Sequence, residues 1–287
     1  MQNIIGLGRA GVNIATGFAE YPQYTIYTID SEPNQMPNHL LLAAQPTHED
    51  YEMSVPDLSG YFKDIVDGED ILFIVGGGGA ISGCSLAILE QLKRCNVHLL
   101  YIRPDTSLLG EKKLMRDRIT YNIFQEYARS GNFERIVLVD NAELDKVVGG
   151  APVIGYYDAL NEILISALHM VNIFDHSEPI MSTLAKPLEV SRITTIGLLN
   201  IEKNEEKLLF PLTSIREKSY YYAVNNETLQ TDRTLFKTIT DQMKEKIIED
   251  KLKISYGIYS TQYKQKYGFL IARSSMVQGV LEETQEV

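Results

Sequence analysis

The first half of the chain alternates short apolar runs with segments of helical periodicity. The apolar runs predict strands at Asn3–Leu7, Tyr24–Ile29, Asp70–Val75, Val97–Ile102 and Arg135–Val139. The periodic segments predict helices at Ala10–Ala19, Pro56–Val66, Gly83–Cys95, Lys112–Ser130 and Tyr156–Phe174. Because the strands are nearly continuous apolar runs and alternate with helices, they predict βαβ units and a parallel sheet covered on both faces.

The pattern changes after residue 175. A polar, proline-containing stretch, Asp175–Pro187, is a candidate boundary. Beyond it we expect strands at Ile193–Ile201, Lys207–Leu212, Ser219–Val224, Lys253–Ser260 and Tyr267–Arg273, and a helix at Arg233–Asp250. Strands grouped around one helix predict a smaller α+β domain. The expected division is therefore an α/β domain at 1–175, which includes the helix that ends near Phe174, an α+β domain at 176–278 and an acidic tail at 279–287.

Composition narrows the function classes. The chain has 287 residues, 44% of them hydrophobic, which is enough for two modest cores. The formal net charge of −11 argues against direct nucleic-acid binding, which needs a basic footprint. We expect Cys84 and Cys95 to be reduced thiols, because their spacing is not that of metal ligands. With no targeting segment and no apolar run of about 18 residues, we expect a cytoplasmic protein that neither spans nor binds a membrane.

Two glycine-rich segments carry the candidate chemistry. Gly6–Gly11 (GLGRAG) follows the first strand and opens a helix, and Gly76–Gly83 (GGGGAISG) does the same after the third predicted strand. Glycines at such junctions let backbone N–H groups approach a phosphate at a helix N-terminus. The first segment also matches the dinucleotide fingerprint, with Asp30 where an NAD-binding acid would lie. The alternative for the first segment is a tight turn whose glycines serve packing, whereas an NAD-binding domain leaves the second segment without a role.

Five segments, in order along the chain, share a resemblance to one family. They are Asn3–Asn13 (NIIGLGRAGVN), Gly77–Gly83 (GGGAISG), Gly110–Met115 (GEKKLM), Asn141–Val147 (NAELDKV) and Tyr157–Glu162 (YDALNE). They resemble the first glycine loop of FtsZ, the tubulin signature GGGT-G-[ST]-G, the EGKKRM and NDKLLKV segments of FtsZ, and the YCIDNE segment of tubulin. The chain thus resembles the tubulin/FtsZ superfamily of filament-forming GTPases. The resemblance covers residues 1–175 and implies a Rossmann-like GTPase domain joined by a central helix to a smaller α+β domain.

The resemblance also implies which residues bind GTP or GDP with Mg²⁺. The phosphate cradle would include Gly8, Arg9, Ala10, Asn13, Gly77, Gly78, Gly79, Ala80, Ile81, Ser82 and Gly83. Tyr157 and Asn161, four residues apart and so on one helix face, would stack on and recognise guanine. Glu111 would contact the ribose, and Asn141 would be a further nucleotide-binding residue. The structural alternatives are a buried tyrosine with a helix-capping asparagine for the pair, a solvated helix start at Glu111 and a helix N-cap at Asn141.

Several positions depart from the family pattern. Ala80 and Ile81 replace the Thr and middle Gly of the signature, and Arg9 and Ala10 replace glycines. A β-branched residue does not readily adopt a positive φ, so we expect the second loop to bend differently. The region Leu42–Pro56 is acidic where FtsZ has a glycine-rich phosphate loop, which predicts poor γ-phosphate contact and weak or lost hydrolysis.

The catalytic acid is the least determined position. In the family, acidic residues after the central helix reach the nucleotide of the neighbouring subunit. Spacing from Asn161 favours Glu189, with Asp175 and Glu178 as alternatives, and an ordinary surface role for Glu189 stays open.

The leading prediction is a GTPase that forms head-to-tail homopolymers and hydrolyses GTP at the subunit interface. The chain is short, and in this it resembles the small, divergent family members that phages or plasmids carry. By analogy this implies positioning or segregation of DNA or virions, with a DNA-bound or virion adaptor as a second partner. The alternatives are a tubulin-like protein with weak or no GTPase activity and an NAD-binding Rossmann oxidoreductase.

Overall fold

The buried apolar runs of the sequence assemble into one mixed sheet in the computed structural model, which describes residues 2–250 and 252–279. The strands of the first half are β1 (Asn3–Leu7), β2 (Thr25–Asp30), β3 (His39–Leu41), β4 (Asp70–Gly76), β5 (Asn96–Arg103) and β6 (Arg135–Asp140). Those of the second half are β7 (Met181–Ser182), β8 (Ile193–Asn200), β9 (Glu205–Leu208), β10 (Ile215–Asn225), β11 (Lys253–Thr261) and β12 (Tyr267–Ser274).

The strand order is β3-β2-β1-β4-β5-β6-β8-β12-β10-β11-β7, with β9 paired to β8. Neighbouring strands from β3 to β8 are parallel, whereas β12 is antiparallel to both β8 and β10. The α/β fold class with a parallel sheet is therefore confirmed. The sheet runs on across the predicted domain boundary, because Ile136 and Val137 of β6 pair with Ile193 and Thr194 of β8.

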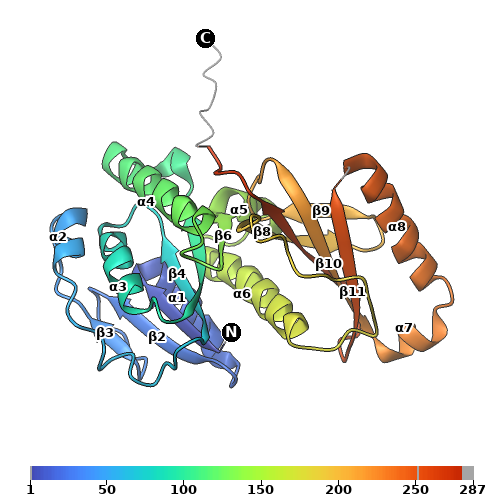
Figure 1. Cartoon of the computed structure of the whole chain (residues 1–287), viewed down its shortest axis with the longest axis horizontal. Coiled ribbons are helices and arrows are strands. Elements are labelled where there is room, and N and C mark those ends of the chain that lie inside the picture. Colours follow the sequence, from blue (N-terminus) through green and yellow to red (C-terminus); the bar gives the residue numbers. More distant parts are fainter. Residues whose placement is uncertain (1, 251, 280–287) are drawn as a thin grey trace, which may run out of the picture.

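Helices cover both faces of this sheet (Figure 1). They are α1 (Gly8–Gly17), α2 (His48–Met53), α3 (Ser85–Gln91), α4 (Glu111–Arg129), α5 (Asn141–Val148), α6 (Tyr156–Asp175), α7 (Asn226–Thr231) and α8 (Leu235–Asp250), with 3₁₀ turns η1 (Phe18–Glu20), η2 (Ala80–Cys84) and η3 (Thr106–Leu108). Apolar side chains of α3 and α4 pack on one face, and those of α1, α5 and α6 pack on the other. The predicted central helix is α6, which contacts both halves of the sheet.

Not every predicted element forms. The helix expected at Pro56–Val66 is wrong: this stretch begins without regular structure and continues as turns and bends. Its apolar residues Leu58, Phe62 and Ile65 are nevertheless buried in the core, because hydrogen-bonded turns bring side chains at these spacings to the same side. Gly60 disfavours a continuous helix within this short stretch.

Other elements are shifted. The helix expected at Gly83–Cys95 begins earlier, as the 3₁₀ turn η2, and α3 ends at Gln91. The strand expected at Lys207–Leu212 is displaced to β9, and β10 is longer than the Ser219–Val224 expected. The short elements β3, α2 and α7 have no counterpart in the prediction, because only long elements produce a clear period.

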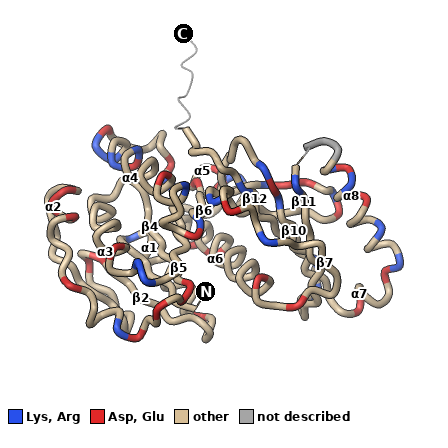
Figure 2. Tube along the Cα trace, viewed as in Figure 1, with Lys and Arg blue, Asp and Glu red and all other residues tan. Residues whose placement is uncertain are grey.

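The predicted three-part division of the chain stays a prediction. Of the tail expected at 279–287, residues 280–287 lie outside the described residues. Among residues 2–250 and 252–279, no helix is long and apolar enough to cross a membrane. Lys and Arg are interspersed with Asp and Glu along both halves of the trace (Figure 2), so each half of the described chain carries charges of both signs.

Candidate nucleotide site

A cavity of about 300 Å³ lies where β1 and β4 end and α1 and α6 begin. The two predicted glycine loops form its floor, because the carboxyl ends of neighbouring parallel strands meet at one edge of the sheet. The predicted site residues that line the cavity are Gly8, Arg9, Ala10, Asn13, Gly77, Gly79, Ile81, Asn141, Tyr157 and Asn161. The structure thus brings together residues from four separate stretches of the sequence.

The remaining predicted binding residues lie outside this lining: Gly78, Ala80, Ser82, Gly83 and Glu111. Ser82 donates its hydroxyl to the Gly79 carbonyl at 2.7 Å, and Gly83 packs against the His48 backbone. Ala80 packs against the core, and Glu111 is exposed at the first residue of α4. These residues shape or flank the second loop, and their contact with a ligand stays a prediction.

The first loop combines packing with an open helix end. Gly11 lies against the carbonyl of Ile74, and Gly6 lies against Gly11, so these two glycines let β1, α1 and β4 approach closely. Gly8 has a φ of +67°, which favours glycine. The N-cap residue of α1, Leu7, makes no capping hydrogen bond through its side chain, so the first backbone N–H groups of the helix can face a ligand of negative charge.

The second loop places the positive φ on a glycine and its β-branched residue in a helical turn. The positive φ falls on Gly78, at +79°, and Gly79 is extended. Ala80 and Ile81 then form the 3₁₀ turn η2, so the β-branched residue has no need of a positive φ. The Ile81 side chain lies over Gly8: its Cγ2 is only 2.7 Å from where a Cβ on Gly8 would be. The two loops therefore interlock through Gly8 and Ile81.

The other wall of the cavity comes from α5 and α6. Tyr157 and Asn161 line the same cavity, which confirms that one face of the helix carries both, and the Tyr157 side chain is 62% exposed. The helix N-cap proposed for Asn141 is wrong. Asp140 is the cap, because its carboxylate accepts the Ala142 N–H at 2.8 Å, and Asn141 is the first residue of α5. Asn141 is thereby available to the cavity.

A second cavity, of about 600 Å³, adjoins the first and shares Asn13 and Asn161 with it. Its other lining residues are Thr16, Gly17, Glu20, Tyr21, Asn34, Asp158, Glu162, Ile165 and Ser166. Sequence reasoning missed these residues, since Asn34 lies in an irregular segment and the helical ones belong to ordinary amphipathic faces. Asn13 and Asn161 therefore have space on both sides, which suits contact with a flat, polar group.

Asp30 does not take the place of an NAD-binding acid. It is 7% exposed, its carboxylate accepts the Ser31 backbone N–H at 2.7 Å, and it is not among the residues that line either cavity.

The candidate catalytic acids are remote from the cavity of their own subunit. Asp175 ends α6, whereas Tyr157 lies in its first turn, and a helix of 20 residues spans about 30 Å. Asp175 accepts the Tyr221 hydroxyl at 3.0 Å and lies 3.9 Å from Arg135. Glu178 and Glu189 are exposed in the segment between α6 and β8. None of the three lines the cavity, so any role in turnover would require a second subunit.

Of the comparisons with known proteins, the one with solved structures finds matches. No family model matches the sequence, and no curated protein matches it. Among solved structures, a GTPγS-form TubZ protofilament from Bacillus thuringiensis serovar israelensis is 15% identical with a TM-score of 0.69, and the match covers 96% of this chain and 87% of that chain. The chain has the tubulin/FtsZ fold.

Two further structures agree. CetZ1 from Haloferax volcanii, a GDP-bound monomer, is 18% identical with a TM-score of 0.68, and the match covers 96% of this chain and 94% of that chain. An empty FtsZ dimer from M. jannaschii is 13% identical with a TM-score of 0.68, covering 94% and 87%. The predicted resemblance to the tubulin/FtsZ superfamily is confirmed at the level of the fold. Within that fold, the cavity of this chain lies where β1, β4, α1 and α6 converge.

Proposed function

We propose that this tubulin-like chain binds GTP and GDP and hydrolyses GTP in head-to-tail homopolymers. The observation that carries the proposal is the single cavity that joins two glycine loops to Tyr157 and Asn161. Backbone N–H groups and Arg9 suit phosphates, whereas an exposed aromatic ring beside an amide suits a purine base. The GTPγS-form TubZ and GDP-bound CetZ1 structures share the fold and so support a guanine nucleotide.

Mg²⁺ is proposed together with the nucleotide. The cavity lining includes no carboxylate, so the ion would be held by phosphate oxygens and water, as Mg²⁺ often is. Its charge would offset that of the phosphates.

Isothermal titration of nucleotide-free protein tests the assignment. We expect GTP and GDP, each with Mg²⁺, to bind more tightly than ATP and NAD. A response to NAD without one to GTP would instead support an oxidoreductase.

Base recognition depends on Asn161. We expect Asn161→Ala to weaken GTP binding by about 10-fold, because polar groups of the base lose their partner at a cost of about 1–3 kcal/mol. ATP binding should change little, which makes the GTP-to-ATP affinity ratio the quantity to measure. Asn122→Ala, on the exposed face of α4, is the matched control. A folded Asn161→Ala protein with the parent's affinity ratio would remove Asn161 from the site.

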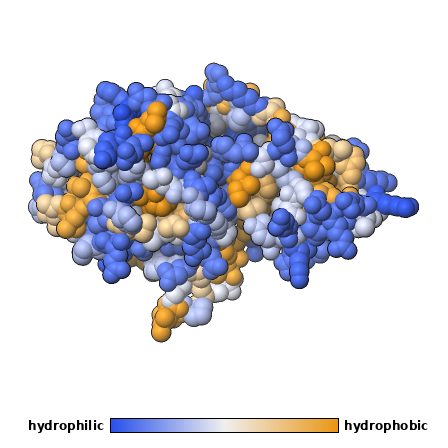
Figure 3. Space-filling model, turned by 90° about the horizontal axis from the view of Figure 1, so that it is seen from below, coloured by the Kyte–Doolittle hydropathy of each residue, from blue (hydrophilic) through white to orange (hydrophobic). Residues whose placement is uncertain are grey.

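An exposed apolar segment supports self-association. Val153 and Ile154 are 95% and 93% exposed and lie directly before α6, whose Tyr157 lines the cavity. Apolar surface of this kind often marks a protein contact. Figure 3 shows that apolar groups on the face seen from below form separate patches within hydrophilic surface. TubZ structures described as two-stranded and four-stranded filaments share this fold.

We expect the double variant Val153→Ser, Ile154→Ser to raise severalfold the protein concentration needed for assembly, while GTP affinity stays that of the parent. Sedimentation of polymer at increasing protein concentration measures this. Met276→Ser removes exposed apolar surface elsewhere and should assemble normally. Unchanged assembly of the double variant would exclude this segment from the contact.

A tubulin-like protein with weak or no turnover is the second candidate, favoured by the 3₁₀ turn at Ala80 and Ile81 in place of the family's Thr and Gly. We also propose, by analogy, a role in positioning or segregating DNA or virions through an adaptor. One structure of the same fold is a type III plasmid segregation TubZ, 14% identical with a TM-score of 0.66. Co-purification of a DNA-bound or virion protein with the polymer tests this role.

A further inference from the structure

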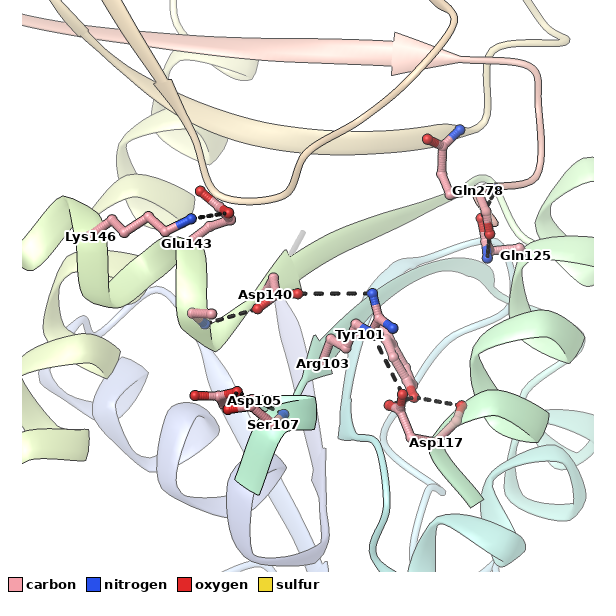
Figure 4. Close-up of polar contacts among 11 residues, drawn as sticks. Tyr101, Arg103, Asp105, Ser107, Asp117, Gln125, Asp140, Glu143, Lys146 and Gln278 are labelled. Atoms are coloured by element: carbon pink, nitrogen blue, oxygen red, sulfur yellow. Dashed lines mark hydrogen bonds and ion pairs between the residues drawn. The ribbon is translucent and has the colours of Figure 1, made fainter. Parts of the chain in front are cut away.

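The second glycine loop rests on a buried polar pair. A Cβ built on Gly77 would overlap the Asp117 carboxylate and the Tyr101 hydroxyl, so the loop backbone is in direct contact with both. The Tyr101 hydroxyl donates to Asp117 Oδ1 at 2.6 Å (Figure 4). Asp117 is fully buried on α4, and Tyr101 is fully buried on β5. A buried carboxylate therefore lies beneath the second loop, although it does not line the cavity itself.

That carboxylate faces a buried cation. Arg103, at the end of β5, is 4% exposed, and its Nε lies 3.6 Å from Asp117 Oδ2. Burial raises the pKa of the Asp117 carboxyl, while the Tyr101 hydrogen bond and the Arg103 charge act in the opposite direction. Without the cation, an ionised Asp117 beneath the loop would oppose the binding of an anion above it. Arg103 balances this charge.

The same cation reaches the opposite wall of the cavity. Arg103 Nη1 lies 4.0 Å from Asp140 Oδ2, and Figure 4 shows Arg103 between Asp140 and Asp117. Asp140 caps α5 through its bond to Ala142 and so places Asn141 at the cavity. Arg103 is thus linked to the glycine loop through Asp117 and to Asn141 through Asp140.

The cluster is held more loosely than a structural ion pair. The distances of 3.6 and 4.0 Å are longer than hydrogen bonds, and neither Arg103 Nε nor Asp117 Oδ2 has a hydrogen-bond partner among the described residues. The Tyr121 ring, 5.2 Å from Arg103 Cζ, occupies one side of the guanidinium. Buried ion pairs are weak evidence for stability, and what distinguishes this one is that Arg103 lies between acids from both cavity walls.

We propose that Arg103 is a positioning residue for the nucleotide: it holds the Gly77 loop and the Asn141 end of α5 at the separation at which both face one bound guanine nucleotide. The inference rests on the proposed function. Arg103 is not among the residues that line the cavity, so it acts through Asp117 and Asp140 rather than by direct contact.

Arg273 provides a matched control. It is also 4% exposed, and its Nη1 donates to Ser219 at 2.8 Å. It lies on β12, opposite the beginning of β8, in register with Thr194, and lines a different cavity. Replacing either arginine removes a buried cation, but only Arg103 joins the walls of the candidate nucleotide site.

The test compares Arg103→Gln, Arg103→Lys and Arg273→Gln by titration with GTP and GDP, with thermal unfolding in parallel. We expect Arg103→Gln to weaken both nucleotides by about 10-fold and Arg103→Lys to recover most of that loss. Arg273→Gln should lower the melting temperature and leave nucleotide affinity unchanged. A folded Arg103→Gln protein with the parent's affinity would overturn the inference, as would equal losses in Arg103→Gln and Arg273→Gln.

If Arg103→Gln does not fold at the assay temperature, the variants Tyr101→Phe and Asp140→Asn test the inference instead. Each removes one link of the cluster and should weaken GTP and GDP severalfold, and parent-like affinity in both would overturn the inference. A parent protein that binds no guanine nucleotide contradicts the proposed function itself. A parent that binds while the cluster variants bind equally well contradicts only the role of Arg103.

Discussion

Gly8→Val should abolish nucleotide binding, with a loss of more than about 100-fold in GTP affinity. Gly8 has a φ of +67°, which valine adopts only with strain, and its missing side chain is the space into which Ile81 packs. A valine would therefore displace the first loop, the second loop or both. Because Gly8 also lines the cavity, its side chain would occupy space that a phosphate needs. Titration with GTP measures the loss.

Gly131→Val separates backbone strain from blockage of the site. Gly131 has a φ of +87°, and no atom lies within 4 Å of where its Cβ would be. It follows α4 in an exposed turn. This variant should lose stability and keep the parent's GTP affinity. If a folded Gly8→Val protein binds GTP normally, the first loop has no part in nucleotide binding.

Glu189→Gln should reduce GTP turnover by about 100-fold or more while leaving nucleotide binding and assembly in place, because a positioned carboxylate contributes that much to activating water. The acid is absent from the cavity of its own subunit, so turnover per subunit should rise with protein concentration. Phosphate release measured over a range of protein concentrations, with light scattering in parallel, tests both effects.

The neighbouring acids serve as comparisons. Asp175 is already engaged by Tyr221 and lies close to Arg135, so Asp175→Asn should act mainly on stability. Glu178→Gln tests the other exposed carboxylate of the segment. Turnover that does not depend on protein concentration would exclude catalysis across the interface, and normal turnover in Glu189→Gln would move the role to Glu178. A parent that binds GTP without turnover would favour the non-hydrolysing candidate.

The parallel half of the fold was predictable because its strands are buried on both faces. Runs such as Ile71–Val75 are fully apolar, and an alternating helix between each pair of strands leaves few other topologies. The helix predicted at Pro56–Val66 was wrong for a physical reason. Leu58, Phe62 and Ile65 are buried at helical spacing, yet a run of turns and bends buries the same three side chains.

The candidate site was predictable where glycines and a helical spacing mark it, as at Gly8, Gly77, Tyr157 and Asn161. Their convergence on one cavity follows from strand order, which places β1 beside β4. The N-cap alternative for Asn141 was wrong by one residue, since Asp140 is an equally good cap, and the binding role of Asn141 stays a prediction.

The buried cluster of Arg103, Asp117 and Asp140 could not be found from the sequence. Each residue lies on a different element, and a lone charged residue at the end of a strand or on a helix reads as solvated surface. Only the fold shows that the three approach one another.

The continuous sheet couples the stability of the two halves. Ile193, Phe210 and Leu212 belong to the same apolar cluster as Tyr121 and Phe124 of α4. On the other face, aromatic side chains of β10, β11 and β12 share a cluster with α6. Neither half therefore has a complete core by itself, and each would expose apolar surface if separated. A ligand that binds the native state raises the melting temperature of the whole cooperative unit, so a nucleotide bound beside β1 would also protect β10 and β12 against heat and proteolysis.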